Sequence, residues 1–205
     1  MTYNDFIIEN GVLKEYKGTA NNVTIPEGVV EIGDWSFAVC KNVVSVKIPN
    51  GVKKIGNDAF WNCESLENII IPYSVKTIGK EAFSDCISLA NIVIPNSVTN
   101  LGSKAFAHCE ELKEIFMSNK ISCIKSETFL CCLSLSNVII PNGVKKISGK
   151  AFALCESLAS ITVPDSVESI GKNAFCWMPE PTFYVSKGSY AESYAKENNI
   201  PFVAE

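Results

Sequence analysis

The phrase I-G-x-x-A-F-x-x-C returns along this chain at a fixed interval of 23 residues. Its first position is occupied, without insertion or deletion, by Ile32, Ile55, Ile78, Leu101, Ile124, Ile147 and Ile170. A constant period in this range is typical of solenoids, in which each repeat forms one rung of a coil. Because each rung packs only on its neighbours, the 205 residues predict one continuous core rather than two globular domains.

Within one repeat, a leucine-rich pattern predicts a short strand with one buried and one exposed face. Leu66-x-x-Ile69-x-Ile71 has the L-x-x-L-x-L spacing of leucine-rich repeats. Side chains alternate between the two faces of a strand, so Ile69 is expected to point into the core. Asn68 and Ile70 are then expected to point outward on the concave side of the coil. The proline that follows lacks a backbone donor and is expected to end the strand.

The remainder of each repeat predicts tight turns on the convex side. Gly79 is expected to relieve such a turn, and Ala82 and Phe83 are expected to fill the core behind it. The stretch is short and contains Asn, Asp, Ser and Gly, so turns or pieces of 3₁₀-helix are expected there rather than long helices. A single rung leaves both of its flat faces uncovered, so the two ends of the coil require caps.

The predicted caps set the boundaries within a single domain that spans residues 1–205. Residues 1–31 form an N-terminal cap, in which two alternating strands around the Asn10-Gly11 turn predict a β-hairpin, followed by a half-repeat. Residues 32–169 hold six repeats of 23 residues. Residues 170–205 hold a partial repeat and a C-terminal helical cap.

The C-terminal cap is predicted from Ser189-x-x-Glu192, which resembles a capping box at the start of a helix. The helix is expected to be short and to run through about Asn198. Its buried face is expected to be formed by Tyr190, Ala191, Tyr194 and Ala195.

Charge and composition argue against nucleic-acid and membrane partners. The net charge is −4, and all 18 basic residues are lysine. Arginine is the preferred side chain for phosphates and guanine edges, so no nucleic acid is expected as a partner. No apolar run approaches the ~18 residues that span a bilayer, so direct membrane insertion is not expected. Met1–Asp5 lack the basic start and apolar stretch of a signal peptide, so the chain as given would be cytoplasmic.

Six of the nine cysteines occupy the same repeat position: Cys40, Cys63, Cys86, Cys109, Cys132 and Cys155. Equivalent side chains in a stack point in parallel, and each interior cysteine has two equal neighbours. We therefore expect a ladder of buried free thiols, which donate weakly to loop carbonyls, rather than disulfides. Cys123, Cys131 and Cys176 lie outside this ladder and are either accessible thiols or chance occupants of partly buried turns.

The repeat I-G-x-x-A-F-x-x-C-x-x-L-x-x-I-x-I-P-x-S-V resembles the BspA-like class of leucine-rich repeats, named for a bacterial surface antigen. The opening I-I-E-N-G-V-L-K-E-Y-K-G and the closing segment Y-V-S-K-G-S-Y-A-E-S-Y-A-K-E-N-N-I-P-F look like the caps of that class. The resemblance covers essentially the whole chain. It implies a horseshoe-like solenoid, often surface-exposed and implicated in adhesion or in binding host proteins, and it carries no catalytic residues.

Repeat and resemblance together predict a leucine-rich-repeat solenoid of the right-handed β/α superhelix class. Short parallel β-strands would form the concave face, and turns or 3₁₀ pieces the convex face. The location stays open, because the resemblance suggests the cell surface or secretion while the chain as given lacks a signal peptide.

Several repeats depart from the pattern. Ser118 replaces the proline of the fourth repeat, Lys125 replaces the glycine of the fifth, and Ser148-Gly149 shifts that glycine in the sixth. The last repeat is one residue short before Phe183. Either local irregularity of the curvature or a partner-specific kink near residues 117–126 accounts for these departures.

The concave face is predicted to carry two outward rows, of which one has an apolar centre. The first is polar throughout and reads Ser45, Asn68, Asn91, Glu114, Asn137 and Ser160. The second reads Lys47, Ile70, Val93, Phe116, Ile139 and Thr162, and its four central members are called the apolar stripe below. On strands ~4.8 Å apart the stripe would be about 15 Å long.

A contiguous exposed apolar patch usually marks a contact surface. The stripe (Ile70, Val93, Phe116 and Ile139) and the neighbouring Asn68, Asn91 and Asn137 are therefore the predicted partner-binding residues. The asparagines would supply hydrogen bonds to a peptide or a glycan. The alternative is that Ile, Val and Phe occupy these positions only because they suit β-strands.

Catalytic, metal and cofactor sites find little support. The single histidine, His108, limits a nucleophile–base pair to one place, and the adjacent Cys109 is expected to point inward. Asp85, His108 and Cys131 occupy one position in three consecutive repeats, but a straight row is poor tetrahedral geometry for zinc. No catalytic residue, metal ligand or cofactor is therefore predicted.

The predicted function is non-enzymatic binding of a protein, peptide or glycan through the concave face. Adhesion or host interaction is the setting that the family resemblance suggests. The chain is expected to be a monomer. The main alternative is a structural spacer or scaffold module of a larger assembly. An enzyme is a remote third possibility.

Overall fold

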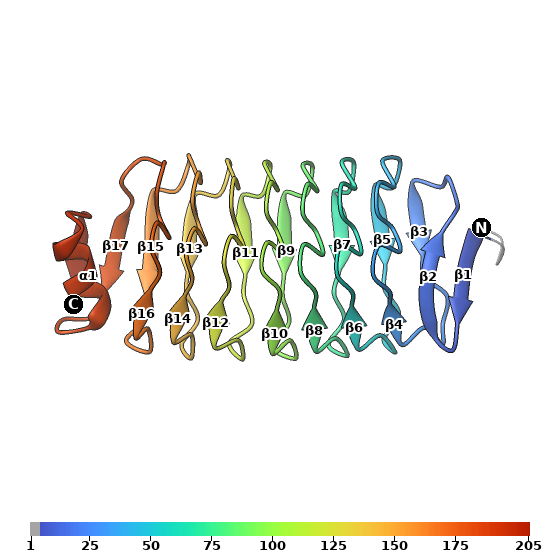
Figure 1. Cartoon of the computed structure of the whole chain (residues 1–205), viewed down its shortest axis with the longest axis horizontal. Helices are drawn as coiled ribbons and strands as arrows, with labels where there is room; N and C mark the ends of the chain where they lie inside the picture. Colours follow the sequence, from blue (N-terminus) through green and yellow to red (C-terminus); the bar gives the residue numbers. More distant parts are fainter. Residues whose placement is uncertain (1–4) are drawn as a thin grey trace.

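The computed structural model describes residues 5–205 and shows the repeats stacked as the rungs of one parallel β-solenoid (Figure 1). Met1–Asn4, which belong to the predicted N-terminal cap and to the segment searched for a signal peptide, lie outside the described residues. Each full rung contributes a strand of three or four residues and a strand of two residues, which are joined by turns. The solenoid predicted from the repeat is confirmed.

The longer strands lie side by side in the main sheet, whose solvent side is the predicted concave face. Partners pair in parallel and 23 residues apart, so that Ser45 lies beside Asn68 and Asn91 beside Glu114. The strands are β3 (Asn22–Thr24), β5 (Ser45–Lys47), β7 (Asn68–Ile70), β9 (Asn91–Val93), β11 (Glu114–Phe116), β13 (Asn137–Ile139), β15 (Ser160–Val163), β17 (Thr182–Val185) and β18 (Phe202–Ala204). Backbone pairing runs in three blocks, β3-β5-β7, β9-β11 and β13-β15-β17-β18.

A second, narrower sheet runs along the solenoid and was not predicted. Its strands are β4 (Glu31–Ile32), β6 (Lys54–Ile55), β8 (Thr77–Ile78), β10 (Asn100–Leu101), β12 (Cys123–Ile124), β14 (Lys146–Ile147) and β16 (Ser169–Ile170). The strands from β4 to β10 pair in one block and those from β12 to β16 in another. Two residues are too few to show an alternating pattern in a sequence, so only the tertiary pairing reveals these strands.

A glycine follows five of the seven two-residue strands and is required there by close packing, which corrects the role predicted for Gly79. A Cβ atom on Gly79 would lie 2.5 Å from the carbonyl carbon of Gly56, and one on Gly102 would lie 2.2 Å from the carbonyl oxygen of Gly79. Neighbouring rungs therefore touch backbone to backbone at this point. Lys125 occupies the next position of this column, and the pairing between β10 and β12 is interrupted there. The departure from the repeat thus coincides with a local break in the second sheet.

The convex arcs consist of successive tight turns, as predicted, but with an unexpected backbone conformation. In residues 5–205, fourteen non-glycine residues with φ of 53–63° fall into two columns four residues apart, beginning with Trp35 and Val39. A side chain in this left-handed region costs about 1–2 kcal/mol. Hydrogen bonds between rungs offset the cost: the backbone N–H groups of Trp35, Phe37 and Val39 donate to carbonyls of the following rung at 2.8–3.0 Å.

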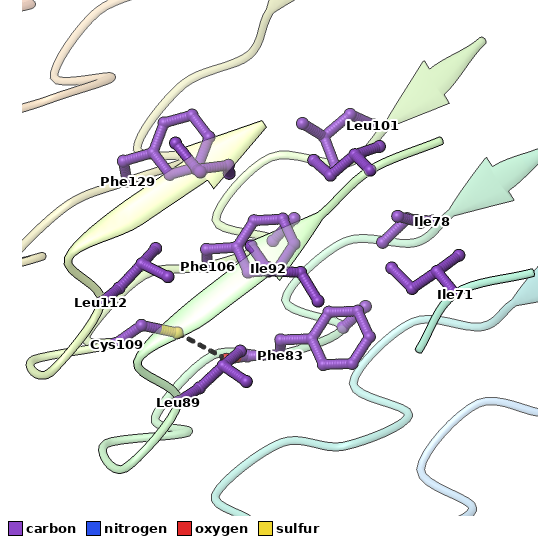
Figure 2. Packing of buried hydrophobic residues seen from close by; sticks show 14 of the residues in the cluster. Ile71, Ile78, Phe83, Leu89, Ile92, Leu101, Phe106, Cys109, Leu112 and Phe129 are labelled. Carbon is purple, nitrogen blue, oxygen red and sulfur yellow. Dashed lines mark hydrogen bonds between the residues drawn. The ribbon is translucent and has the colours of Figure 1, made fainter. Parts of the chain in front are cut away.

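The core is built from columns of identical side chains (Figure 2). Seven phenylalanines stack from Phe37 to Phe175, with ring centroids 4.9–5.8 Å apart and interplanar angles of 2–19°. The predicted thiol ladder is confirmed for five of its six cysteines, because every cysteine is free and the Sγ atoms of these five donate to phenylalanine carbonyls at 3.1–3.2 Å. One of these bonds, from Cys109 to Phe83, is drawn in Figure 2. Cys40, predicted to be buried, is only half-buried, because it lies in the first rung of the ladder.

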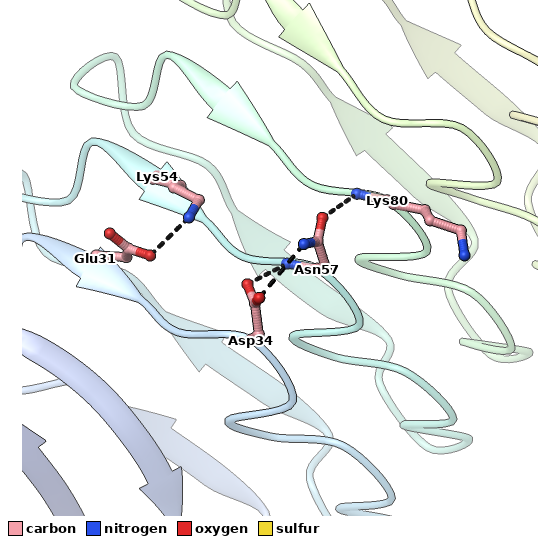
Figure 3. A network of polar contacts seen from close by, with 5 residues as sticks. All are labelled: Glu31, Asp34, Lys54, Asn57 and Lys80. Carbon is pink, nitrogen blue, oxygen red and sulfur yellow. Dashed lines mark hydrogen bonds and ion pairs between the residues drawn. The ribbon is translucent and has the colours of Figure 1, made fainter.

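Polar side chains also join one rung to the next outside the core (Figure 3). The Asp34 carboxylate accepts hydrogen bonds from the backbone N–H of Asn57 at 2.7 Å and from its side-chain amide at 3.3 Å. The Asn57 amide oxygen in turn accepts from the backbone N–H of Lys80 at 2.9 Å. In the second sheet, Lys54 Nζ donates to Glu31 Oε1 at 2.8 Å. Such bonds reinforce the same 23-residue register.

The N-terminal cap is the predicted hairpin. Strands β1 (Phe6–Glu9) and β2 (Val12–Tyr16) are antiparallel, and Asn10 and Gly11 both have positive φ, as a two-residue hairpin turn requires. Strand β2 also pairs with β4, so the hairpin covers the edge of the second sheet. The Tyr16 ring stacks on Phe37 with ring centroids 4.9 Å apart, and Phe6 packs against Tyr16 at 5.1 Å to close the aromatic column.

The C-terminal cap is helix α1 (Tyr190–Glu197), close to the predicted bounds. Ser189 accepts a hydrogen bond from the Glu192 N–H at 3.1 Å, whereas the Glu192 carboxylate accepts from Gly188 N–H rather than from Ser189. Ala191 and Ala195 are fully buried and Tyr194 is half-buried, but Tyr190 is exposed, contrary to the prediction. Its hydroxyl instead receives the Ile170 N–H at 3.4 Å. After the helix, β18 adds an unpredicted last strand beside β17.

Gly79→Ala is expected to destabilise the protein by about 2 kcal/mol or more, because the new Cβ would overlap the Gly56 backbone. Gly51→Ala is the matched control, since a Cβ there approaches nothing closer than the Val29 carbonyl oxygen at 3.2 Å. Chemical unfolding followed by circular dichroism measures both. Equal stability of the two variants would contradict the close-packing role of the glycine column.

Candidate functional site

The main sheet places the predicted apolar stripe in solvent. Side chains alternate along each strand as predicted, so that Ile92 is 2% exposed while the adjacent Val93 is 59% exposed. The other stripe residues are also largely exposed: Ile70 79%, Phe116 63% and Ile139 72%. Val93 and Phe116 pair in register on β9 and β11, whereas Ile70 and Ile139 lie on the adjoining blocks. The stripe is therefore a surface feature and contributes little to the core.

The row that contains the stripe extends further than predicted. Thr162 pairs with Tyr184 on β17, and Tyr184 pairs with Val203 on β18. Tyr184 and Val203 are 43% and 42% exposed. The apolar row, defined as the stripe with Thr162, Tyr184 and Val203, thus continues to the C-terminal end of the sheet. Strand β18 lies outside the 23-residue period, so its contribution leaves no repeat signal in the sequence.

The three predicted asparagines lie beside the stripe, but their side chains differ in availability. Asn137 is engaged within the protein, since its Oδ1 accepts from Ser160 Oγ at 2.6 Å and its Nδ2 donates to Ser136 Oγ at 3.2 Å. Asn68 and Asn91 are exposed, and within residues 5–205 their side chains make no hydrogen bond. Two of the three amides are therefore free to bind a partner.

Three shallow hollows lie along the apolar row of the main sheet face, and a smaller one lies beside Asn68 and Asn91. The N-terminal hollow, about 970 Å³, contains Ile70 and the exposed ring of Tyr73, which the sequence analysis did not single out. The middle hollow, about 420 Å³, contains Phe116 and Ile139. The C-terminal hollow, about 690 Å³, contains Ile139, Thr162, Tyr184 and Val203. The apolar row thus connects all three.

The charges that line these hollows are unequal. Glu27 and Lys47 line the N-terminal hollow, and Lys113 and Glu114 line the middle one, so each holds one charge of either sign. The C-terminal hollow is lined by Asp165 and Glu205 without a lysine. Neither of these two carboxylates forms an ion pair within the part of the chain described here. Along the apolar row the face is therefore negative at its C-terminal end and balanced elsewhere, while Glu67 and Glu111 line the small hollow beside Asn68 and Asn91.

Exposed aromatic rings on the convex side already have contacts within the chain. Trp35 meets Trp61 edge to face, with ring centroids 5.8 Å apart. Near the other end of the solenoid, Lys150 Nζ lies 5.7 Å from the centroid of the Trp177 ring, within cation–π range. These rings are isolated at opposite ends, whereas the apolar row is continuous across many strands.

A nucleophile–base pair is not formed at the single histidine. Cys109 is fully buried and its Sγ donates to the Phe83 carbonyl at 3.2 Å, as the ladder predicts. Burial raises the pKa of the Cys109 thiol far above its usual range, so the thiol stays neutral. His108 is half-buried in the turn, and its φ is 59°. Within residues 5–205, no three His, Cys, Asp or Glu side chains lie close enough together to hold a metal ion. Asp85, His108 and Cys131 therefore do not form a metal site in this structure.

The ladder thiols have little nucleophilic character. Burial raises the pKa of Cys63 and of Cys155 to about 12, and that of Cys86 and Cys132 well above the usual value. The pKa of Cys40, in the first rung of the ladder, is raised to about 11 by burial and by the nearby Glu15 carboxylate. A thiolate is the reactive form of cysteine, so the ladder is structural.

A family model for the BspA type leucine-rich repeat region matches the chain with six copies, over residues 7–122 and 53–182. These matches cover most of the chain. The chain belongs to the BspA-type leucine-rich repeat family. The resemblance drawn from the repeat and the caps is therefore confirmed.

Solved structures of bacterial leucine-rich repeat proteins share this fold. The T. pallidum leucine-rich repeat protein TpLRR is similar with a TM-score of 0.76 and 25% identity, over 100% of this chain and 97% of that chain. A leucine-rich repeat protein from Bacteroides ovatus gives a TM-score of 0.56 and 26% identity, over 98% and 67%. A leucine rich cell surface protein from Faecalibacterium prausnitzii gives 0.51 and 25%, over 90% and 75%.

None of the curated proteins matches this BspA-type chain. Within residues 5–205, no helix has the length and apolar character needed to cross a bilayer.

Thiol-specific labelling of the native protein at pH 8 is expected to divide the cysteines into three groups. Cys63, Cys86, Cys109, Cys132 and Cys155 should remain unlabelled, because they are buried and neutral. The half-buried Cys123, Cys131 and Cys176 should react within the same time, whereas the half-buried Cys40, whose pKa is raised to about 11 by burial, should react more slowly than these three. Mass spectrometry of labelled peptides reads out each site, and denatured protein, in which all nine should react, is the control.

Stability is also expected to fall at alkaline pH. The folded pKa of Cys155, about 12, lies above the ordinary value of ~8.5, so its stabilising contribution is complete below pH ~8.5 and is lost as the pH rises toward 12. Between pH 9 and 11, the free energy of unfolding should therefore fall less steeply in Cys155→Ala than in the wild type. The two slopes should differ by up to ~1.4 kcal/mol per pH unit. Parallel curves for the two proteins would contradict the buried, neutral thiol.

Proposed function

We propose that the chain is a non-enzymatic recognition module that binds a protein, peptide or glycan through its main sheet face. The observation that carries the proposal is the apolar stripe, four large side chains that are 59% to 79% exposed on strands of one sheet. A contiguous patch of this kind is typical of contact surfaces. The free amides of Asn68 and Asn91 beside it add hydrogen-bonding groups.

The same row supplies an internal comparison that favours function over strand propensity. Lys47 on β5 and Thr162 on β15 occupy equivalent positions, so the fold accepts polar side chains there. Large apolar side chains nevertheless fill the four central positions, although they are mostly exposed there and contribute little to the core. The β-propensity of Ile, Val and Phe would be met equally by Thr, which is also β-branched. The apolar identity is therefore better explained by a partner than by the strand.

We further propose that the chain acts in adhesion or in a similar contact at a cell surface. The supporting observation is the similarity to a structure described as a leucine rich cell surface protein from Faecalibacterium prausnitzii. The competing function is that of a spacer module within a larger assembly, whose main sheet face would have no partner.

Phe116→Glu and Ile139→Lys are expected to reduce binding at least tenfold, because each places a charge in the middle of the apolar stripe. Ligands would first be selected with the wild-type protein from a random-peptide phage library and a glycan array, and their affinities then measured by biolayer interferometry. Both side chains are mostly exposed, so the free energy of unfolding should change by less than about 0.5 kcal/mol.

Val30→Lys is the matched control, since Val30 is 46% exposed and the equivalent residues of the next two rungs, Lys53 and Lys76, are lysines. It should bind like the wild type. Loss of stability in the stripe variants would place these side chains in the core. Failure to select any ligand that depends on the stripe would favour the spacer function.

A further inference from the structure

We propose that the segment bound on the main sheet face is an amphipathic α-helix of about 19 residues with a basic end, lying along the apolar row with that end over the C-terminal hollow. This inference rests on the proposed function and names the class of partner. It is drawn from the spacing of the row, from its width and length, and from the charges along it.

The spacing of the row matches the pitch of a helix. Neighbouring strands place one side chain of the row every ~4.8 Å. An α-helix brings a side chain back to the same face every turn, or about 5.4 Å. A helix lying parallel to the row falls out of step with the rungs by only ~0.6 Å per turn, or about 2 Å over the four rungs of the stripe. Successive helical turns could then contact successive rungs from Ile70 to Ile139.

An extended segment fits the same row less well. Side chains on one face of a β-strand recur every ~6.6 Å, so they would fall out of step with the rungs after two residues. Polyproline II is worse, because its three-residue turn advances about 9.3 Å. The helix is therefore the regular conformation that lets consecutive apolar side chains meet consecutive rungs.

The dimensions of the row favour one helix over a second copy of the protein. From Ile70 on β7 to Val203 on β18 the row crosses six strand intervals, or about 29 Å, which a helix of about 19 residues spans. Its width is one side chain, about 7 Å, which gives an apolar area of roughly 200 Å². A stable dimer buries about 800 Å² on each partner. A helix about 10 Å across covers the row and the edges of the polar rows beside it.

Charge complementarity sets the basic end. Asp165 and Glu205 line the C-terminal hollow together with Tyr184 and Val203, and neither carboxylate has an ion-pair partner in the part of the chain described. Lys187 follows Asp165 by one rung but does not line this hollow. The other two hollows pair Glu27 with Lys47 and Lys113 with Glu114. Glu67 and Glu111 line the small hollow beside the asparagines rather than the apolar row. Within the apolar row, a lysine or arginine is thus favoured at the end of the bound segment that lies over the C-terminal hollow.

The test uses three synthetic 19-residue peptides with acetylated and amidated ends. The first has leucines at helical spacing (i, i+4, i+7, i+11, i+14), Ala and Gln elsewhere, and two lysines at one end. In the second peptide two glutamates replace those lysines. The third has the composition of the first but places its leucines at alternate positions, as on a strand. Isothermal titration calorimetry with the full chain should show the first peptide binding at least tenfold more tightly than either of the others.

Protein variants separate the helix from the underlying function. In the double variant Asp165→Lys, Glu205→Lys, the preference between the first two peptides should reverse; an unchanged preference would overturn the basic end. Equal binding of the first and third peptides, or no peptide binding, would overturn the helix. A selected glycan whose binding is lost in Phe116→Glu would also overturn the helix, but it would leave the proposed function intact. The same holds if analytical ultracentrifugation shows a dimer of the wild-type protein that Phe116→Glu disrupts. If nothing selected or synthetic depends on Phe116, the proposed function itself fails.

Discussion

The structure depends on one constraint, which is that each rung must return every 23 residues to a position about 5 Å above the one before. The phenylalanine column shows this most directly, since its ring centroids lie 4.9–5.8 Å apart from Phe37 to Phe175. At such a rise the rungs touch at the glycine column, where even a Cβ atom would overlap the neighbouring backbone. An inserted residue would move every later side chain out of its column, which explains why six consecutive repeats keep the same length.

The same constraint explains features that look unfavourable in a single rung. Residues as bulky as Trp35 and Val39 adopt positive φ because the arcs gain hydrogen bonds to the next rung in return. Five ladder cysteines, Cys63 to Cys155, are buried as free thiols, and each donates to a phenylalanine carbonyl of another rung. In a repeat protein, stability resides in the interfaces between neighbours, so the cost within each rung is met by the next.

Columns divide the chain into positions that serve the fold and positions that are free for function. Core columns repeat one residue type with few exceptions, whereas surface columns vary from rung to rung. The apolar stripe is unusual because it is a surface column that turns apolar over four rungs and returns to Thr162. The uneven charge of the three hollows adds a direction to that surface, with the acidic end at Asp165 and Glu205. The repeats that form the columns of the core are those matched by the BspA-type family model.

The amino-acid sequence by itself determined the period, the phase of the longer strands, and the inward or outward direction of residues such as Ile92 and Val93, because these follow from local alternation and a strict repeat. It also determined the thiol ladder and both caps, apart from the half-buried Cys40 and the exposed Tyr190. Only the tertiary structure decided the second sheet, the positive φ of the arcs and the pairing of β18, since each arises from contacts with a neighbouring rung. The extent of the apolar row to Tyr184 and Val203, and the acidic hollow at its end, were decided there as well. Residues from different parts of the chain meet at these places, and no local pattern records which of them become neighbours.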